Sequence, residues 1–378
     1  MVVKYKSAYP LYPTMRLVYF GRYWRDFGGT EFDIRTMLRE LAKRGCECIA
    51  ISYDTEASAT NARQPLEEEG VKVFYADVPN LNKVGVPVSI RSDKKLFKKV
   101  ALSTLISYLD PGDILMTCFP PQEEAWKIAK KRGASIIQKY TVVYDGYEPE
   151  KWNPIVDMNI FNSEACRDAW KDRGVTGPNM VIYPEIDMKD VVVAESGDGI
   201  GMINPTRHKG SKIFEYLGAE FPDEKFISAG GWAVKPGAVV KRRKNQEYMK
   251  HMKDIGDFYR RLKIMLVPTQ EQHFETYGRV VLEAMFYGVP VIAANKDGIP
   301  EAAEDAAMLV DDYESPEAWK CALKEMLNDN TWCKWKHRAV QRAYNYDLGR
   351  MIGRWELALK MVRGGDNSPP DFGMGENE

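Results

Sequence analysis

Short runs of apolar residues alternate with longer segments of helical periodicity along most of the chain. Between residues 31 and 45, apolar residues recur at Ile34, Leu38 and Leu41 before Gly45, which predicts a helix and its C-terminal stop. Strands that alternate with helices are typical of parallel sheets with crossover connections. In the first half, apolar runs predict strands at 16–20, 46–52, 71–76, 113–119, 134–140, 156–163 and 180–187.

The same alternation starts again after a linker-like segment at 188–198. It predicts strands at 199–205, 224–232, 262–268 and 289–294, with helices at 211–221, between the last two strands, and over most of 316–362. We therefore expect an α/β protein of two doubly wound domains that face each other, with ligands at the C-terminal ends of the strands. The expected division is 1–187, 188–345, a last helix at 346–363, and a disordered Gly- and Pro-rich tail at 364–378.

Composition changes this picture little. Apolar residues make up 44% and charged residues 28% of the chain, and the formal net charge is −1, so charge alone does not indicate nucleic acid or anionic membrane as a partner. The N-terminus lacks a signal-peptide pattern and no run approaches 18 apolar residues, which predicts a cytoplasmic protein without a membrane span. The six cysteines are scattered, as expected for reduced thiols.

The segment 273–302 carries the most informative pattern. A helix is predicted to begin near Tyr277–Gly278 and to run to Tyr287, with Glu275 just before it and Glu283 inside it. Eight residues at the helical rise span about 12 Å, which matches the reach from a sugar across a diphosphate to a ribose. The helix start offers an anion site through the backbone N–H groups of Tyr277, Gly278, Arg279 and Val280.

Two glutamates at this spacing also fit an ordinary crossover, in which Glu275 caps the helix and Glu283 is solvated. The whole string, however, resembles the signature of retaining glycosyltransferase family 4: the glutamate pair, then GVPVI, then a Gly-x-Pro-Glu turn. That resemblance implies a GT-B fold of two Rossmann-like domains, with the last helix crossing back to the first domain. It also implies that a nucleotide-sugar donor is held by Glu275, Thr276, Tyr277, Gly278, Arg279, Val280 and Glu283.

Upstream, the segment 203–231 is similar to the strand, loop and helix in which this family places a Lys–Gly pair against the donor phosphates. Here the pair is Lys209–Gly210. Many relatives carry an arginine several residues earlier, where this chain has Met202–Ile203, so Arg207 or Asn204 is the candidate substitute. In the first half, Gly28–Gly29 resembles the family's glycine-rich loop, which would close over a phosphate or the transferred sugar.

No Asp-x-Asp triplet, the usual diphosphate-bound metal site of the other large glycosyltransferase architecture, occurs in the sequence. We therefore expect no metal and no cofactor beyond the nucleotide-sugar co-substrate. The first half contains no histidine to assist at the sugar, so Glu123, Glu124, Asp145 or a backbone carbonyl would have to do so.

The resemblance implies a metal-independent hexosyltransferase that retains anomeric configuration by a front-face mechanism, with UDP-sugar favoured over GDP-sugar as donor. Glu275, Lys209 and Arg207 are the expected catalytic residues. A sugar-nucleotide epimerase on the same fold and a non-catalytic nucleotide-sugar binder are the alternatives. The acceptor stays open among glycan, lipid, protein, small molecule and modified DNA.

Two basic segments are relevant to the class of acceptor. Residues 94–109 combine a basic start with an apolar stripe through Leu96, Val100, Thr104 and Tyr108. They fit either a core-packed crossover helix or a helix lying on anionic lipid. The KRRK run at 241–244 fits either a solvated surface or a contact with an anionic acceptor such as nucleic acid.

Overall fold

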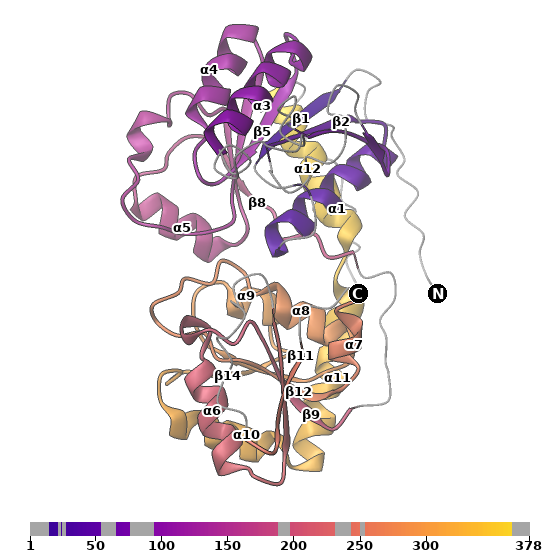
Figure 1. Cartoon of the computed structure of the whole chain (residues 1–378), viewed down its shortest axis with the longest axis vertical. Helices are drawn as coiled ribbons and strands as arrows, with labels where there is room; N and C mark the ends of the chain where they lie inside the picture. Colours follow the sequence, from indigo (N-terminus) through magenta and orange to yellow (C-terminus); the bar gives the residue numbers. More distant parts are fainter. Residues whose placement is uncertain are drawn as a thin grey trace, which may run out of the picture. The chain divides into compact units, whose positions relative to one another are not determined.

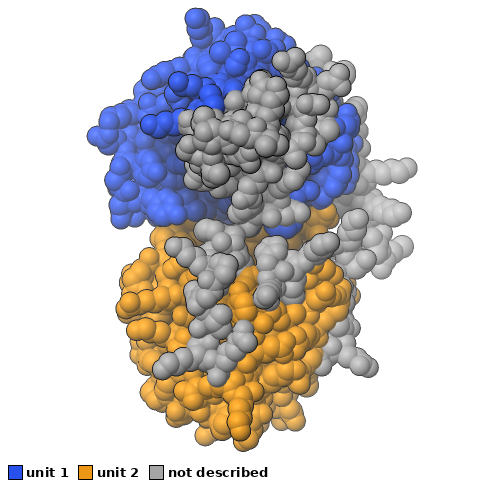
Figure 2. All heavy atoms as spheres, in the orientation of Figure 1, with its two compact units in different colours: residues 1–162, 169–185, 348–378 blue, residues 163–168, 186–347 orange. Residues whose placement is uncertain are grey.

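The computed structural model describes residues 15–21, 24, 28–53, 66–75, 94–187, 197–230, 243–249 and 254–364. The chain divides into two compact units (Figure 2): unit 1 comprises residues 1–162, 169–185 and 348–378, and unit 2 comprises residues 163–168 and 186–347. The main crossings thus fall at 185/186 and 347/348, where the sequence analysis set boundaries at 187/188 and 345/346. Most of the predicted linker and tail lie outside the described residues.

Unit 1 is built on an eight-stranded sheet in the order β3-β4-β2-β1-β5-β6-β7-β8 (Figure 1). Neighbouring strands are parallel except for β3 and β4. The strands are β1 (Arg16–Gly21), β2 (Glu47–Ser52), β3 (Leu66–Glu68), β4 (Val71–Tyr75), β5 (Ile114–Cys118), β6 (Ser135–Tyr140), β7 (Met158–Phe161) and β8 (Asn179–Val181).

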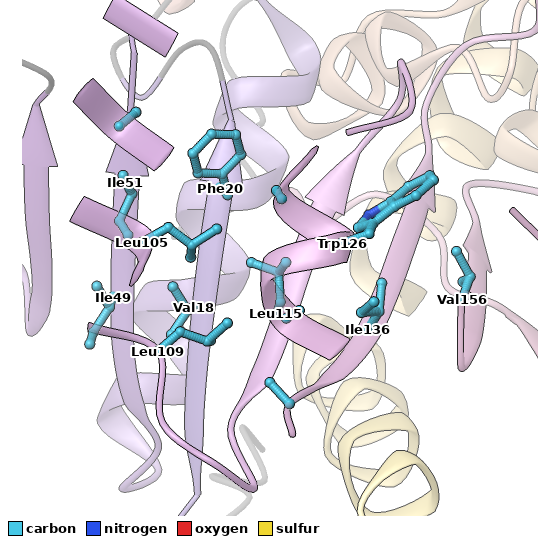
Figure 3. Close-up of a cluster of buried hydrophobic side chains, with 14 of the residues drawn as sticks. Val18, Phe20, Ile49, Ile51, Leu105, Leu109, Leu115, Trp126, Ile136 and Val156 are labelled. Atoms are coloured by element: carbon cyan, nitrogen blue, oxygen red, sulfur yellow. The ribbon is translucent and has the colours of Figure 1, made fainter. Parts of the chain in front are cut away.

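Helices cover both faces of this sheet, which explains why its central strands are apolar throughout rather than alternating. One face packs under α3 and α4 through a buried cluster that includes Val18, Phe20, Leu105, Leu115 and Trp126 (Figure 3). On the other face, α1 packs against α12. The helices of this unit are α1 (Gly29–Lys43), α3 (Lys94–Tyr108), α4 (Glu123–Arg132), η1 (Pro149–Lys151) and α12 (Leu348–Val362). Helix α5 (Glu164–Asp172) spans the boundary, because residues 163–168 belong to unit 2.

Unit 2 contains a six-stranded parallel sheet in the order β11-β10-β9-β12-β13-β14. Its strands are β9 (Gly199–Ile203), β10 (Lys225–Ala229), β11 (Gln246–Met249), β12 (Leu262–Val267), β13 (Val291–Ala294) and β14 (Met308–Val310). Its helices are η2 (Arg207–Lys209), α6 (Ser211–Glu220), α7 (Gly256–Tyr259), α8 (Arg279–Phe286), α9 (Ile299–Ala303), α10 (Pro316–Met326) and α11 (Asp329–Asn345).

The predicted strands are present within a few residues, with one clear exception. The run at 180–187 was expected to be a strand throughout, but β8 ends at Val181. The prediction is therefore wrong for residues 182–187. Pro184 lacks a backbone N–H and disfavours continued pairing there. The predicted helical segment at 316–362 consists of three helices, α10, α11 and α12.

The packing of α3 decides between the two interpretations of residues 94–109, a core-packed helix and a helix lying on lipid. Ala101 and Leu105, with Leu109 just after the helix, are fully buried in the core under β1 and β2. The buried stripe therefore lies one position beyond the predicted one, and it packs on protein. This confirms the interpretation as a core-packed crossover helix. No helix among the described residues has the length and apolar character needed to cross a membrane.

A fully buried ionic cluster joins four segments of unit 1. Lys139 on β6 lies 2.9 Å from a carboxylate oxygen of Asp33 on α1 and 3.5 Å from one of Glu185, and all three side chains are 0–1% exposed. The indole N–H of Trp355 on α12 donates to Glu185, and the Lys139 ammonium lies 5.0 Å from the centre of that ring. The cluster thus fastens α12 to the segment that precedes the first crossing.

Burial and the neighbouring Asp33 carboxylate raise the pKa of Glu185 well above its usual range. Burial lowers the pKa of Lys139, but the charges of Asp33 and Glu185 outweigh it, so the pKa of the ammonium is raised. The arrangement is therefore an Asp33–Lys139 ion pair at 2.9 Å, with the Glu185 carboxyl, whose pKa is raised, as a more distant partner of the ammonium.

This assignment predicts opposite outcomes for two substitutions. Lys139→Met leaves the Asp33 carboxylate buried without its partner, so we expect a loss of about 3–5 kcal/mol in the free energy of unfolding. Glu185→Gln keeps the Asp33–Lys139 pair and replaces the carboxyl with an amide of the same shape, so we expect a change below about 1 kcal/mol. Urea unfolding of both variants measures this, and equal destabilisation would show that Glu185 is as important to the buried cluster as Lys139.

Candidate functional site

The site residues of unit 2 gather where the order of its sheet reverses. From β9 the chain moves outward through β10 and β11, and it then returns to place β12 and β13 on the other side of β9. In open parallel sheets, ligands bind at the C-terminal ends of the strands at such a reversal. The loops that follow β9, β12 and β13 all end at this edge, and they carry Asn204, Lys209, Glu275 and Asp297.

Lys209 and Glu275, 66 positions apart in sequence, form an ion pair at this edge, and their side chains are 25% and 16% exposed. Gly210 makes the approach of the two loops feasible. Its φ is +91°, and a Cβ atom there would lie 2.0 Å from the carbonyl oxygen of Pro268, so only glycine fits. The sequence prediction named both members of the pair, and the structure brings them together.

The backbone of Glu275 is held from the loop after β13. The side chain of Asp297 accepts from the Glu275 N–H at 3.0 Å, and the Gly298 N–H donates to the Glu275 carbonyl at 3.0 Å. Lys296, 7% exposed, lies 3.1 Å from Asp297 and donates to the carbonyl of His273 at 2.9 Å. These hydrogen bonds fix the backbone of Glu275 and so restrict the position of its carboxylate.

Burial raises the pKa of Glu275, but the Lys209 charge and hydrogen bond, together with the Gly278 N–H, outweigh it. The net pKa is lowered, and the carboxylate is ionised at neutral pH. Two histidines stand beside the pair: the rings of His208 and His273 are 5.0 Å apart, and His273 lies 3.9 Å from Glu275. Burial and the Lys209 charge lower the pKa of His273 to about 4, so its ring is neutral.

Helix α8 begins at Arg279, one to two residues after the predicted start, because Gly278 adopts φ +87° as its N-cap. The side chains of Thr276 and Tyr277 are buried, at 7% and 1% exposure. The N–H groups of a first helical turn have no acceptors within the helix. The start of α8 therefore directs N–H groups and positive dipole toward the edge that holds Lys209.

Glu283, further along α8, is held by two partners. The hydroxyl of Tyr259, fully buried on α7, donates to one carboxylate oxygen at 2.9 Å. Arg279 lies 3.4 Å from the other oxygen. Each oxygen has a second lone pair, so Glu283 can still accept from a ligand hydroxyl. Tyr259 was missed by the sequence analysis, because nothing local in its segment points to a residue 24 positions away.

Two further polar atoms at this edge have no hydrogen-bond partner in the described part of the chain: Asn204 Oδ1 and the fully buried Thr269 Oγ1. Asn204 also has φ +53°, a left-handed conformation that asparagine adopts more readily than most residues other than glycine. The other candidate for the missing family arginine, Arg207, is exposed at the start of η2.

The glycine-rich loop of unit 1 is described only at its end. Gly28 is the N-cap of α1 with φ −163°, and Gly29 is the first residue of that helix. Both lie at the C-terminal side of β1, next to the point where the order of the first sheet reverses between β1 and β5.

Part of the chain is similar in sequence to known glycosyltransferases. Residues 240–346, which include Glu275 and Glu283, match the family described as Glycosyl transferases group 1. The D-inositol 3-phosphate glycosyltransferase of Corynebacterium glutamicum is 39% identical over 90 residues, 23% of this chain and 21% of that protein. Its counterpart from Kineococcus radiotolerans is 33% identical over 121 residues, 29% of this chain and 26% of that protein. The chain thus matches only about a quarter of these relatives' length.

Solved structures resemble the chain over nearly its whole length. HepE from Anabaena, in complex with UDP-glucose, has a TM-score of 0.66 at 16% identity, covering 92% of this chain and 100% of that one. A trehalose-6-phosphate structure from E. coli bound with UDP-2-fluoro glucose has a TM-score of 0.64 at 14% identity, covering 91% and 99%. The fold is therefore that of the GT-B glycosyltransferases, with two α/β domains built on largely parallel sheets, and the segment 240–346 matches the Glycosyl transferases group 1 family.

The neutral state of His273 predicts an acid-sensitive fold. Its pKa is about 4 in the folded protein against an ordinary 6.5, so the unfolded chain binds more protons between these values. Stability should fall as the pH drops from about 6.5 to about 4. His273→Gln should remove about 1–2 kcal/mol of this loss, allowing for the partial exposure of the ring.

Thermal unfolding at several pH values, with His337→Gln on α11 as the matched control, measures the effect. An unchanged pH profile in His273→Gln would show that folding does not lower the pKa of this ring.

Proposed function

We propose that the protein is a glycosyltransferase that moves a hexose from a nucleotide-sugar donor, with UDP-sugar as the first candidate and GDP-sugar as the second. The observation that carries the proposal is the Lys209–Glu275 pair beside the start of α8, with Glu283 held by Tyr259 on the same helix. Lys209 and the N–H groups at the start of α8 suit a diphosphate, and the Glu283 carboxylate further along the helix suits the hydroxyls of a ribose.

In this arrangement Lys209 and the first turn of α8 bind the diphosphate, because an ammonium has three donors and Glu275 occupies only part of them. Glu275 accepts from hydroxyls of the transferred sugar, and Glu283 accepts from ribose hydroxyls. The unpartnered oxygens of Asn204 and Thr269 are available to hydroxyl donors at the same edge.

The reaction we propose retains configuration at the anomeric carbon. The acceptor hydroxyl oxygen attacks that carbon from the face on which the diphosphate leaves, and the bond to the β-phosphate oxygen breaks. The acceptor proton passes to the leaving phosphate oxygen, so the products are the glycosylated acceptor and the nucleoside diphosphate. Lys209 stabilises the charge that develops on the leaving group, and Arg207 is a second candidate for that role.

The comparisons support the donor class without fixing it. Structures that resemble this fold contain UDP-glucose or a fluorinated UDP-glucose, and the partial sequence relatives are named as glycosyltransferases. These observations favour a UDP-sugar. Because the positive groups come from the chain itself, we also propose that turnover needs no metal.

Removing the Glu283 carboxylate should weaken donor binding. Glu283→Ala loses charge-assisted hydrogen bonds to the ribose, and we expect about 1.5–3 kcal/mol, roughly a 10- to 100-fold rise in Kd. Calorimetric titration with UDP-glucose and GDP-mannose measures it, with Glu325→Ala, an exposed glutamate of α10, as control. Unchanged donor affinity in a folded Glu283→Ala protein would refute the ribose assignment.

Metal independence is tested by chelation. Turnover of the donor should persist after exhaustive EDTA treatment, whereas Lys209→Met should lose at least tenfold in kcat/KM, since each 1.36 kcal/mol of lost transition-state stabilisation is a factor of ten. Loss of activity on chelation and recovery with Mg²⁺ or Mn²⁺ would overturn the proposal. Turnover that proceeds without any acceptor would point to an epimerase instead, and donor binding without turnover would point to a binder.

A further inference from the structure

Two lysines lie at the C-terminal edge of the sheet of unit 2, and their hydrogen bonding differs. Lys209 donates to one partner among the described residues, the carboxylate of its ion pair. Lys296, whose side chain is 7% exposed, has three acceptors: the carbonyl oxygens of Gln270 at 3.2 Å and His273 at 2.9 Å, and the Asp297 carboxylate at 3.1 Å. An ammonium has three N–H donors. Lys209 therefore keeps N–H groups for a ligand, whereas those of Lys296 are all used by the protein itself.

Lys296 joins loops that follow three strands of this sheet. It belongs to the loop after β13, and the two carbonyls that it binds belong to the loop after β12. The ring of Tyr313, which follows β14, has its centre 5.5 Å from the ammonium. The N–H of Gln270 in turn donates to the carbonyl of His208, the residue before Lys209, at 3.0 Å. Lys296 thus fixes the segment 270–275 relative to the other loops of this edge.

Asp297, the next residue, has a backbone conformation that is uncommon outside glycine. Its φ is +51°, in the left-handed region, which aspartate adopts more readily than most residues but less readily than glycine. Such positions persist where the surrounding structure holds them, and they cluster at binding and active sites. Here one carboxylate oxygen of Asp297 accepts from the Glu275 N–H at 3.0 Å and from the Lys296 ammonium at 3.1 Å. The carboxylate of Asp297 therefore connects Lys296 to the backbone of Glu275.

The backbone on both sides of the Glu275 side chain is bound by this loop. Its N–H donates to Asp297, and its carbonyl accepts from the Gly298 N–H at 3.0 Å. A Cβ atom at Gly298 would lie 2.3 Å from the carbonyl oxygen of Thr276, so the loop is in direct contact with the backbone there. Because a hydrogen bond weakens outside a narrow range of distance and angle, a small shift of this backbone would misplace the Glu275 carboxylate for a ligand hydroxyl.

The residues assigned to the nucleotide have separate support. Glu283 is held by Tyr259 and Arg279, and the N–H groups at the start of α8 belong to that helix. None of these contacts involves Lys296 or Asp297. A disturbance at Asp297 should therefore displace the Glu275 carboxylate and leave the groups for the ribose in place.

We propose that Asp297 and Lys296 are positioning residues, which hold the Glu275 carboxylate in place for the transferred sugar. They act on the binding of the sugar and not on the binding of the nucleoside diphosphate. The inference rests on the proposed function in assigning Glu275 to the sugar and Glu283 to the ribose. The support that Asp297 gives to Glu275 is measurable without any ligand.

Two substitutions separate the carboxylate of Asp297 from its backbone conformation. Asp297→Gly removes the carboxylate, and glycine adopts positive φ freely. Asp297→Asn keeps an oxygen acceptor for the Glu275 N–H, and asparagine also adopts the left-handed region. The matched control is Glu69→Gly in the turn between β3 and β4, because Glu69 has φ +53° and pairs with Arg39 at 2.8 Å. The control thus also replaces an acidic residue at positive φ with glycine and removes an ion pair.

The positioning role is measured first without a ligand, by amide hydrogen exchange on the whole chain. In Asp297→Gly the Glu275 N–H has lost its acceptor, so exchange in the segment 270–278 should be at least about tenfold faster than in wild type. Asp297→Asn and Glu69→Gly should stay within about threefold of the wild-type rate. Unchanged exchange in a folded Asp297→Gly protein would overturn the positioning role.

The effect on the sugar is measured by calorimetry, with UDP-glucose against UDP and GDP-mannose against GDP. Asp297→Gly should bind the nucleotide-sugar about tenfold more weakly, and it should bind the nucleoside diphosphate within about threefold of wild type. Asp297→Asn should recover most of the lost affinity. Equal weakening of both ligands, or of neither, would overturn the assignment to the sugar, because a merely structural aspartate does not distinguish between them.

Failure of the proposed function would give a different result. The wild-type protein would then bind none of these nucleotides, while the exchange measurement would still show whether Asp297 holds the backbone of Glu275.

Discussion

The ion pair between Lys209 and Glu275 is the interaction on which the candidate site of unit 2 depends. Each charge is largely removed from water, so each needs the other, and the loops after β9 and β12 must come close enough for them to meet. The absence of a side chain at Gly210 allows that approach, and Asp297 fixes the backbone of Glu275 from a third loop. The neutral His273 adds no third charge to this balance.

The ion pairs of the two units differ in how completely they are buried. In unit 1, Lys139 and its two carboxyls are completely enclosed and bind four segments of the chain together. In unit 2, the Lys209–Glu275 pair keeps part of its surface exposed, and the same edge carries oxygens without a partner in the described part of the chain. A closed cluster stabilises the fold, whereas an open one retains hydrogen-bonding capacity for a ligand.

The polar groups at the two sheet edges also differ in kind. Unit 2 offers an ammonium and the N–H groups of a helix start, which suit a phosphate. The loops after β5 and β7 of unit 1 instead carry buried amide oxygens, at Gln122 and Asn162, without a hydrogen-bond partner among the described residues. The same position in a parallel sheet thus carries different polar groups in the two units, because the loops that follow the strands differ.

The sequence by itself determined the central strands and the two-unit α/β architecture, because apolar runs are local patterns, and its resemblance to a family motif made Lys209, Glu275 and Glu283 candidate site residues. It missed β3, β11 and β14, short edge strands whose pairing depends on a neighbour. Only the tertiary structure decided that Tyr259 supports Glu283, that Glu185 is enclosed with Lys139, and which amide oxygens lack partners. Each of these depends on burial and on contacts between segments far apart in the chain, and no local pattern encodes them.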